Sequence, residues 1–492
     1  MSAPQKLLKG FLYTLGSGYL ARLASVALTV LIRRELPPSV FADAVFGVTL
    51  FILLASPREF GLMYGLLHFQ DKTGAFLQTH FTLNLLICGL TLLGALLALW
   101  GLHHWWPQRF SAEVALVAGA FSLLFFLRNL TLTAEGLLRL DLEFGRLSLF
   151  HGLGTVLSLV GALGAAWAGW GMWSLILGGW TTYSVFSLVY TCFYSGAVGL
   201  SRPQGFGRLH LDPEWTRRLL GYGVWIWVGW MLQTFVLWYD KLVVGLVVGG
   251  DEVALYENAW FWVQIPTAIL THIIFNYTST LYARYQHDRP RLSEVFSRML
   301  SLEVWISWPL ALVLVLNARE VIALTNPNWA ESAAMIVWLA GYAFLRPLMD
   351  DCFGLLWAVG STRLSAQLMG LQALVAGLLV PFMAWQWGIR GVAYSMGGGG
   401  GRGLVSLCWG VRRYAEVSWP SIFGAPLLGL GLAALAGLGY SAVAQGQALV
   451  DFILRSALMV GIYAGVVGLL ERQQIAESVA QVRRLLAERR DG

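Results

Sequence analysis

Apolar residues in this chain form long unbroken runs, and neither the strict alternation of a half-buried strand nor the one-sided spacing of a surface helix dominates. Each run is about 20 residues long, which is the length that a helix needs to cross a bilayer. Charged or Pro/Gly-rich segments separate the runs. The pattern predicts fourteen membrane-spanning helices, at residues 10–32, 40–68, 80–101, 111–137, 147–168, 171–196, 219–248, 253–281, 299–317, 330–358, 364–386, 388–410, 421–444 and 449–470.

Lysine and arginine are distributed unevenly between the two sides of this arrangement. If the N-terminus is cytoplasmic, twenty-one of the basic residues in loops or at span ends lie inside and five lie outside, at Arg33, Arg34, Arg109, Arg319 and Arg390. An excess of basic residues marks the cytoplasmic side of membrane proteins. Both termini are therefore predicted to be cytoplasmic.

The chain contains an internal repeat. The segments "FLRNLTLTAEGLL" (126–138) and "FLRPLMDDCFGLL" (344–356) share FLR and GLL at the same spacing, and Trp170 corresponds to Trp387 at nearly the same offset. The repeating unit holds about six spans. An even number of spans returns each half to the same side, so the halves are parallel and related by an axis along the membrane normal.

The repeat predicts the domain organisation. We expect an all-α membrane protein in which two six-helix bundles face a central cavity, followed by two extra spans and an amphipathic cytoplasmic tail. The corresponding ranges are 1–200 and 210–415 for the bundles, 421–470 for spans thirteen and fourteen, and 471–492 for the tail.

Composition agrees with a membrane protein. The chain has 492 residues, 57% of them hydrophobic and 12% charged, whereas soluble chains carry about 25% charged residues. The net charge of +6 does not predict nucleic-acid binding, because the basic residues are spread among loops. The four cysteines show no CxxC spacing, so no metal site, disulfide or cofactor is expected. The N-terminal apolar run lacks a cleavage site and is interpreted as a retained first span.

Seven basic residues fall inside the predicted spans: Arg22, Arg58, Arg128, Lys241, Arg346, Arg402 and Arg455. A charge at the centre of a span costs roughly 2.5–3.5 kcal/mol on the insertion scale, so most of these groups must face water, an acid or one another. Arg455 is close enough to a span end to reach the interface, and Arg58 is adjacent to Glu59. The other five require another explanation.

Polar and aromatic residues share helical faces with these charges. One stripe has a spacing of four residues in the span 330–358, at Trp338, Tyr342, Arg346 and Asp350. The equivalent span of the first half carries Arg128, Thr131 and Glu135 on one face. Similar faces are formed by Tyr19 with Arg22 and by Glu257 with Trp260, and five glycines precede Arg402.

Three segments resemble a known family. "DKLVVGLVVGGDEVALYENAWFWVQIP" (240–266), "LIRRELPPSVFADAVFGVTLFILLASPREFGL" (31–62) and "LWAVGSTRLSAQLMGLQALVAGLLVPFMAWQWGIRGVAYSMG" (356–397) resemble the polysaccharide transporter family, the O-antigen-type lipid-linked oligosaccharide flippases. This family belongs to the multidrug/oligosaccharidyl-lipid/polysaccharide (MOP) exporter superfamily. The chain departs from the pattern at 41–43, where Phe-Ala-Asp replaces the usual Phe-Gly.

The resemblance implies the MOP flippase fold and a function in surface polysaccharide biosynthesis. The implied activity moves an undecaprenyl-pyrophosphate-linked oligosaccharide across a bacterial inner membrane. Its implied partners are the lipid-linked oligosaccharide and membrane lipids, and a polysaccharide polymerase and glycosyltransferases are candidate partners; no nucleic acid is expected.

Guanidinium groups bind a pyrophosphate in bidentate fashion, and Trp and Tyr faces suit sugar rings. The residues predicted to bind the anionic part of the substrate in a cationic cavity are Arg22, Arg128, Arg346, Arg402 and Lys241. The candidates for sugar stacking are Tyr19, Trp260, Trp338 and Tyr342. The candidates for gating or ion coupling are Asp240, Glu257, Asp350, Glu59 and Glu135.

Other functions fit the sequence less well. The ATP-binding motif GxxxxGK[ST] is absent, although a subunit that pairs with a separate ATPase stays possible in principle. A polymerase or ligase would need a sizeable outer loop with catalytic groups. The outer loops of this chain are short, so the chain is not expected to be an enzyme. A multidrug exporter of the same superfamily has twelve spans and a more acidic cavity, whereas this chain is predicted to have fourteen spans and a cationic cavity, so this function is less favoured. A peptidoglycan-precursor flippase is the alternative that the sequence distinguishes least from an oligosaccharide flippase, since its substrate is also linked to undecaprenyl pyrophosphate.

Overall fold

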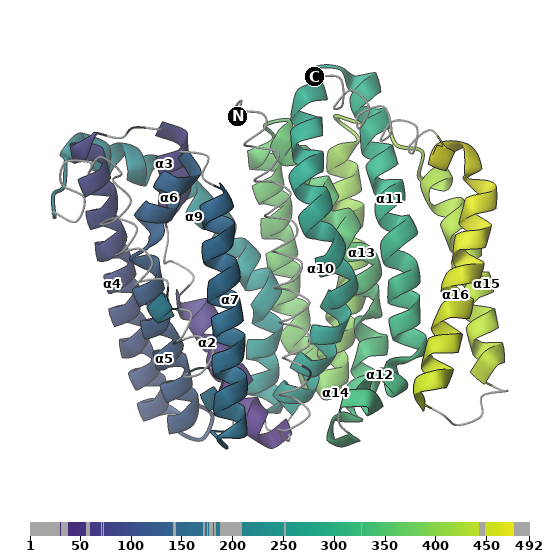
Figure 1. Cartoon of the computed structure of the whole chain (residues 1–492), viewed down its shortest axis with the longest axis horizontal. Coiled ribbons are helices and arrows are strands. Elements are labelled where there is room, and N and C mark those ends of the chain that lie inside the picture. Colours follow the sequence, from purple (N-terminus) through teal and green to yellow (C-terminus); the bar gives the residue numbers. More distant parts are fainter. Residues whose placement is uncertain are drawn as a thin grey trace. The chain divides into compact units, whose positions relative to one another are not determined.

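The computed structural model describes residues 38–55, 60–69, 73–140, 144–170, 209–249, 252–325, 327–441 and 448–476, with a few single positions between these ranges. Every regular element in these ranges is helical (Figure 1). Packing divides the chain into two compact units, Met1–Ala254 and Leu255–Gly492. The division near residues 200–210 rests on sequence repetition and not on packing, so it stays a prediction.

The helices of the first unit are α2 (Pro38–Ala55), α3 (Leu62–Phe69), α4 (Gly74–Trp105), α5 (Ala112–Asn129), α6 (Leu132–Leu140), α7 (Phe144–Trp167), α9 (Pro213–Val243) and the π-helical turn η3 (Val244–Val248). The second unit begins within the first turn of α10. Its elements are α10 (Glu252–Tyr285), α11 (Arg289–Leu316), α12 (Ala318–Thr325), the 3₁₀ turn η4 (Pro327–Trp329), α13 (Ser332–Ala358), α14 (Thr362–Val411), α15 (Trp419–Ser441) and α16 (Ala448–Leu470).

The all-α membrane architecture is confirmed. In the part of the chain that the structure describes, eight helices are long and apolar enough to cross a membrane, and two shorter apolar helices cover 41–54 and 152–167. The predicted span 10–32 and most of 171–196 lie outside the described residues. The total of fourteen therefore stays a prediction.

Two predicted spans are divided in the structure. The span 40–68 consists of α2 and α3, and Phe60 and Gly61, just before α3, have positive φ angles of 42° and 69°. The span 111–137 consists of α5 and α6. Apolar runs predict the length of a helical segment but carry little information about breaks within it.

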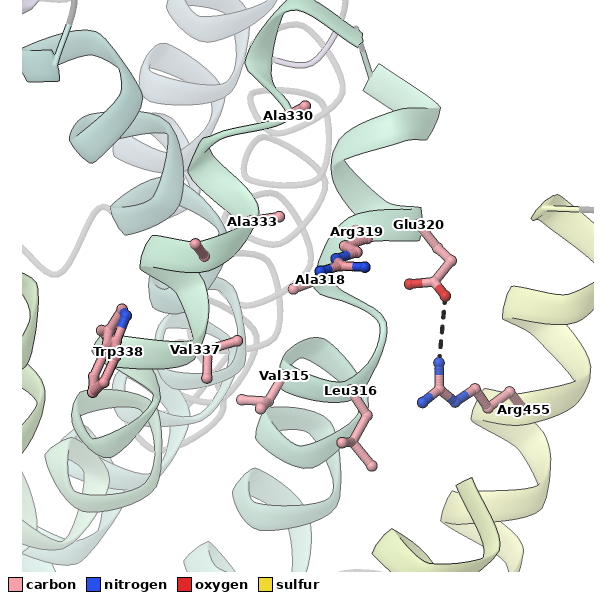
Figure 2. A pocket seen from close by; sticks show the side chains of 11 residues that line it. Val315, Leu316, Ala318, Arg319, Glu320, Ala330, Ala333, Val337, Trp338 and Arg455 are labelled. Atoms are coloured by element: carbon pink, nitrogen blue, oxygen red, sulfur yellow. Dashed lines mark hydrogen bonds and ion pairs between the residues drawn. The ribbon is translucent and has the colours of Figure 1, made fainter. Parts of the chain in front are cut away.

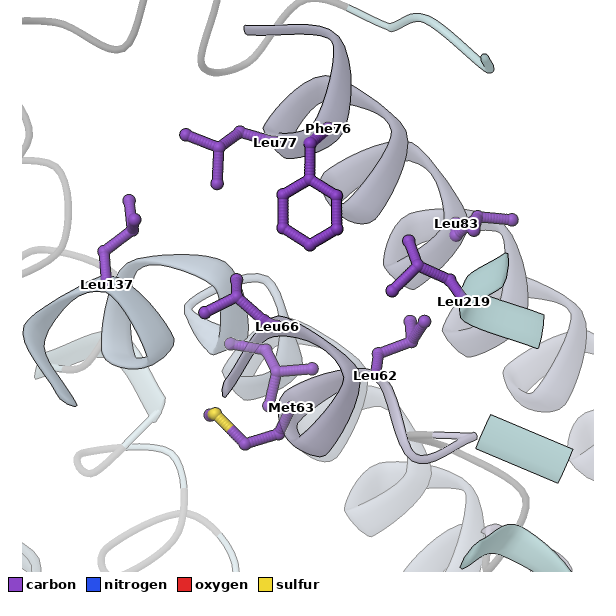
Figure 3. Close-up of a cluster of buried hydrophobic side chains, with 9 residues drawn as sticks. Leu62, Met63, Leu66, Phe76, Leu77, Leu83, Leu137 and Leu219 are labelled. Carbon is purple, nitrogen blue, oxygen red and sulfur yellow. The ribbon is translucent and has the colours of Figure 1, made fainter. Parts of the chain in front are cut away.

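In the first unit, α3, α4, α6 and α9 enclose an apolar core (Figure 3). Leu62 and Leu66 of α3 pack there with Phe76 of α4 and Leu219 of α9. His80 lies beside this core and is fully buried, with Nε2 3.1 Å from the carbonyl oxygen of Leu62 and Nδ1 2.9 Å from Oγ1 of Thr133. Because one ring satisfies polar groups of α3 and α6, it fixes both helices against α4.

In the second unit, α11 joins α13 to the two C-terminal helices. The indole N–H of Trp308 donates to the carbonyl of Phe344 on α13 at 3.0 Å, and its ring stacks on Phe423 of α15 with centroids 5.4 Å apart. The hydroxyl of Tyr463 on α16 donates to the carbonyl of Val304 at 3.1 Å. Figure 1 shows α15 and α16 side by side beyond α11. Spans thirteen and fourteen therefore pack against α11.

The helices α13 and α14 touch through glycine. A Cβ atom at Gly341 would collide with the carbonyl of Gly397, and one at Gly397 would collide with the carbonyl of Trp338. The first of the five consecutive glycines thus permits close helix packing. The helix α14 is also bent at Gly388, whose φ of 58° and ψ of −143° separate the predicted spans 364–386 and 388–410.

Candidate functional site

The polar stripe predicted in span ten exists as a connected series on α13. An Nη2 of Arg346 lies 2.8 Å from Oδ1 of Asp350 one turn later. The Arg346 guanidinium is 5.9 Å from the ring centroid of Tyr342, one turn earlier. The Arg346 and Asp350 side chains are only 14% and 17% exposed. Because each charge is largely removed from water, the pair neutralises itself in this conformation.

Helix α10 supplies an aromatic side to the same series. The ring of Trp260 meets the ring of Tyr342 edge to face, with centroids 4.4 Å apart, and Tyr256 packs on Trp260 in turn. Trp260 is 2% exposed, so neither of its faces is open to a sugar in this conformation. Glu257, on the same helix, is partly buried. The structure therefore brings Trp260, Tyr342, Arg346 and Asp350 together.

Trp338 differs from the other predicted aromatic residues in its exposure. Its side chain is 46% exposed, and its ring and the ring of Tyr394 on α14 meet edge to face with centroids 5.8 Å apart. A large exposed indole with one supported edge is a suitable surface for a sugar ring. Among the described candidates for stacking, Trp338 offers the most open ring.

Arg128 and Glu135 lie in the first unit on either side of the α5–α6 break. The hydroxyl of Thr131 lies 2.9 Å from Oε1 of Glu135 and 2.7 Å from the carbonyl oxygen of Arg128, so its one proton is shared between these two acceptors. At the break, the side-chain amide of Asn84 donates to the carbonyl of Asn129 at 2.7 Å. The structure brings Thr131 and Glu135 together at a helix interruption and not on a continuous helix, and the predicted role of the Arg128 side chain stays a prediction.

Asp240 and Lys241 lie near the end of α9 and are both 1% exposed. The ammonium of Lys241 is 3.8 Å from the ring centroid of Trp238, a cation–π contact within the same helix. The two side chains are adjacent in sequence and about 100° apart around the helix, as the sequence predicted. Their predicted roles in substrate binding and gating stay predictions.

Four predicted residues cannot be placed. Tyr19, Arg22 and Glu59 lie outside the described residues, and Arg402 lies on α14 in a stretch where the structure describes its backbone and not its side chain.

Sequence reasoning missed a buried acidic cluster in the second unit. Glu303 of α11 and Asp351 of α13 are 3% and 1% exposed and close enough to repel each other electrostatically. The hydroxyl of Tyr282 donates to Oδ2 of Asp351 at 2.7 Å, whereas Oε2 of Glu303 and Oδ1 of Asp351 have no hydrogen-bond partner among the described residues. Two buried carboxylates in this arrangement repel each other while both are ionised.

The signal for this cluster was present in the sequence. Glu303 lies inside the predicted span 299–317, and Asp351 follows an acid already singled out, Asp350. One residue rotates a helical side chain by about 100°, so Asp351 points away from the stripe and toward α10 and α11. Both acids therefore meet the criterion that identifies the basic residues, a charged group within a predicted span. No group of three or more His, Cys, Asp or Glu in the described residues could hold a metal ion.

Comparison with known proteins supports both the fold and the family. A family described as "Polysaccharide biosynthesis protein" matches residues 36–334. A segment of 127 residues is 24% identical to the teichuronic acid biosynthesis protein TuaB of Bacillus subtilis (strain 168), and the alignment covers 26% of this chain and 26% of TuaB.

Two solved structures have the same fold. The lipid II flippase MurJ in an inward closed conformation is 12% identical, with a TM-score of 0.72, over 94% of this chain and all of MurJ (100%). An inward-facing multidrug resistance MATE family transporter of the MOP superfamily is 16% identical, with a TM-score of 0.64, over 80% of this chain and 94% of that one. The MOP fold expected from the sequence is therefore confirmed.

Proposed function

Since the chain belongs to the polysaccharide biosynthesis protein family, we propose that it is a flippase for a lipid-linked oligosaccharide used to build a surface polysaccharide. The proposed cargo is an undecaprenyl-pyrophosphate-linked oligosaccharide, moved from the inner to the outer leaflet of a bacterial inner membrane. Glycosyltransferases would supply such a cargo, and a polymerase would consume it.

The observation that carries this proposal is the Arg346 series on α13. A guanidinium inside a membrane helix is expensive unless it binds an anion, and here its counter-ion is a side chain one turn away. A pyrophosphate offers more acceptor oxygens than Asp350 and can bind the guanidinium in bidentate fashion. The cargo would replace Asp350 as the partner of Arg346, while Trp338 and Tyr342 offer apolar ring surfaces for sugars.

The exchange of partners gives a route to alternating access. Releasing Asp350 from Arg346 leaves a carboxylate beside the Glu303–Asp351 cluster, where like charges raise the cost of keeping all three ionised. Cargo binding and proton or cation uptake would then favour each other, and loss of the cargo would reverse both. A two-state exchange of ion pairs is the kind of element that alternating access needs.

Transport by the purified protein tests the proposal. The full chain is reconstituted in liposomes with a fluorescent undecaprenyl-pyrophosphate oligosaccharide in both leaflets, and the fraction reached by an external quenching reagent is followed. Wild type should raise the flipping rate well above that of protein-free liposomes. An unchanged rate with every lipid-linked glycan tested would contradict the proposal.

A second cargo has a specific observation in its favour. The fold matches MurJ, a protein named for lipid II flipping, across the full length of that structure. The same liposomes loaded with lipid II separate the two cargoes. Faster flipping of lipid II than of oligosaccharide-linked undecaprenyl pyrophosphate would favour the peptidoglycan precursor as the substrate.

A further inference from the structure

A cavity of about 620 Å³ opens in the second unit where α11 ends and α12, α13 and α16 meet (Figure 2). Figure 2 shows Arg319, Glu320 and Arg455 on one side of this cavity and Val337 and Trp338 of α13 on the other. Alanines between these walls leave the interior unfilled. The volume is in the range of small-ligand sites, which is about 300–1,000 Å³.

The charges around the cavity do not cancel. Arg455 is 7% exposed, and it donates from Nε to the carbonyl of Gly437 at 2.9 Å and from Nη1 to Oε1 of Glu320 at 3.4 Å. Arg319 is exposed and has no carboxylate partner among the described residues. Two guanidiniums face one carboxylate, so the cavity carries a net charge of about +1 at neutral pH.

The surroundings of Arg455 indicate the kind of anion. The neighbouring side chains on α16, Ile453, Leu454 and Leu458, are 54%, 51% and 40% exposed. Exposed aliphatic residues on a helix that crosses a membrane face acyl chains. A ligand with an anionic head in the cavity and an apolar tail along α16 would satisfy both surfaces.

We propose that this cavity binds the headgroup of an anionic phospholipid. A phosphodiester carries one negative charge, which matches the net charge of the cavity, whereas a pyrophosphate carries more. Arg319 binds the phosphate from the open side, and the unused N–H groups of Arg455 bind it from the buried side. The carbonyl of Gly437 holds the Arg455 guanidinium in place, and Glu320 competes with the phosphate for it. Trp338 lies both in this cavity wall and on the α13 stripe, but the two arginines that bind the phosphate, Arg319 and Arg455, are not part of the Arg346 series.

Lipid-dependent thermal stability tests this proposal. The full chain in detergent is titrated with phosphatidylglycerol or phosphatidylcholine, and the apparent affinity is taken from the rise of the melting temperature. We expect phosphatidylglycerol to bind more tightly. Arg319→Gln should weaken its binding about tenfold, because one charge-assisted hydrogen bond is lost. The matched control is Arg390→Gln, which removes an exposed arginine of α14 outside the cavity.

Glu320→Gln gives the sharper test because the expected sign is opposite. Removing the competing carboxylate should strengthen phosphatidylglycerol binding, although the ion pair with Arg455 is lost. Weaker binding by Glu320→Gln, or equal effects of Arg319→Gln and Arg390→Gln, would overturn the site. If a prenyl pyrophosphate displaces phosphatidylglycerol and Arg319→Gln abolishes flipping, the cavity binds cargo and the phospholipid assignment is wrong.

Discussion

At the scale of single residues, Arg346 and Asp350 show how a membrane protein keeps a charged site ready. Each neutralises the charge of the other within a largely apolar helix, and their charged atoms are 2.8 Å apart. Truncating one partner of a buried pair leaves the other uncompensated. An alanine variant of Arg346 is therefore compared with Arg346→Lys, which keeps the charge and so separates binding from structure.

We predict that Arg346→Ala abolishes cargo flipping and that Arg346→Lys restores only part of it, because lysine keeps the charge and loses the bidentate fork. Flipping is measured in liposomes at equal amounts of inserted protein. The control is Arg298→Ala, since Arg298 and Glu294 form a pair of the same 2.8 Å separation on α11. Full activity of Arg346→Ala would remove this arginine from the substrate site.

Asp350→Asn should bind a short-chain prenyl pyrophosphate more tightly than wild type, by about tenfold, because the competing carboxylate is gone. Binding is measured by titration calorimetry of the purified protein. Weaker binding would show that Asp350 holds Arg346 in the productive orientation and does not compete with the ligand.

At the scale of secondary structure, the contact between α13 and α14 depends on two glycines whose backbones touch. Gly397→Ala should destabilise the protein by about 1–3 kcal/mol, since the added methyl group collides with the backbone of Trp338. Gly399→Ala is the matched control on the same helix, because a Cβ there meets nothing within 4 Å. Melting temperatures in detergent should fall for the first variant only. Equal melting temperatures of the two variants would mean that α14 can move away from α13 to fit the methyl group at little cost in free energy.

The sequence predicted the helices better than it predicted their interruptions. Apolar length sets where a segment can cross the bilayer, and most described spans agree with it. The break after α5 and the continuity of α13 occur at equivalent positions of the repeat, at Asn129 and Pro347. Proline usually disrupts a helix more than asparagine does, so local propensity favours the opposite outcome. At the break, the side-chain amide of Asn84, which lies on another helix, donates a hydrogen bond to the carbonyl of Asn129.

The candidate site was predicted in the same uneven way. The separation of four residues along α13 was sufficient to place Arg346 beside Asp350 and Tyr342, because those contacts lie within one helix. The burial of Trp260 and the meeting of Glu303 with Asp351 depend on how α10 and α11 pack against α13. Spacing along a single helix carries no information about that packing.

At the scale of the whole molecule, the distribution of basic residues predicts the orientation in the membrane. Single cysteines at Gln108 and His287, both exposed, should react with an impermeant thiol reagent from opposite sides in a variant that lacks native cysteines. Gln108 should be labelled in intact cells and His287 only after lysis. Labelling of His287 from outside would reverse the predicted orientation.

The interruption between α5 and α6 also gives the two repeats different mechanical properties. Its counterpart, α13, is a single rod that continues through Pro347, whereas the α5–α6 segment has a joint at residues 129–131, closed by hydrogen bonds from Asn84 and Thr131. A rod transmits displacement along its whole length, and a joint absorbs it locally. We therefore expect the repeats to differ in stiffness, with bending during the transport cycle concentrated at Asn129.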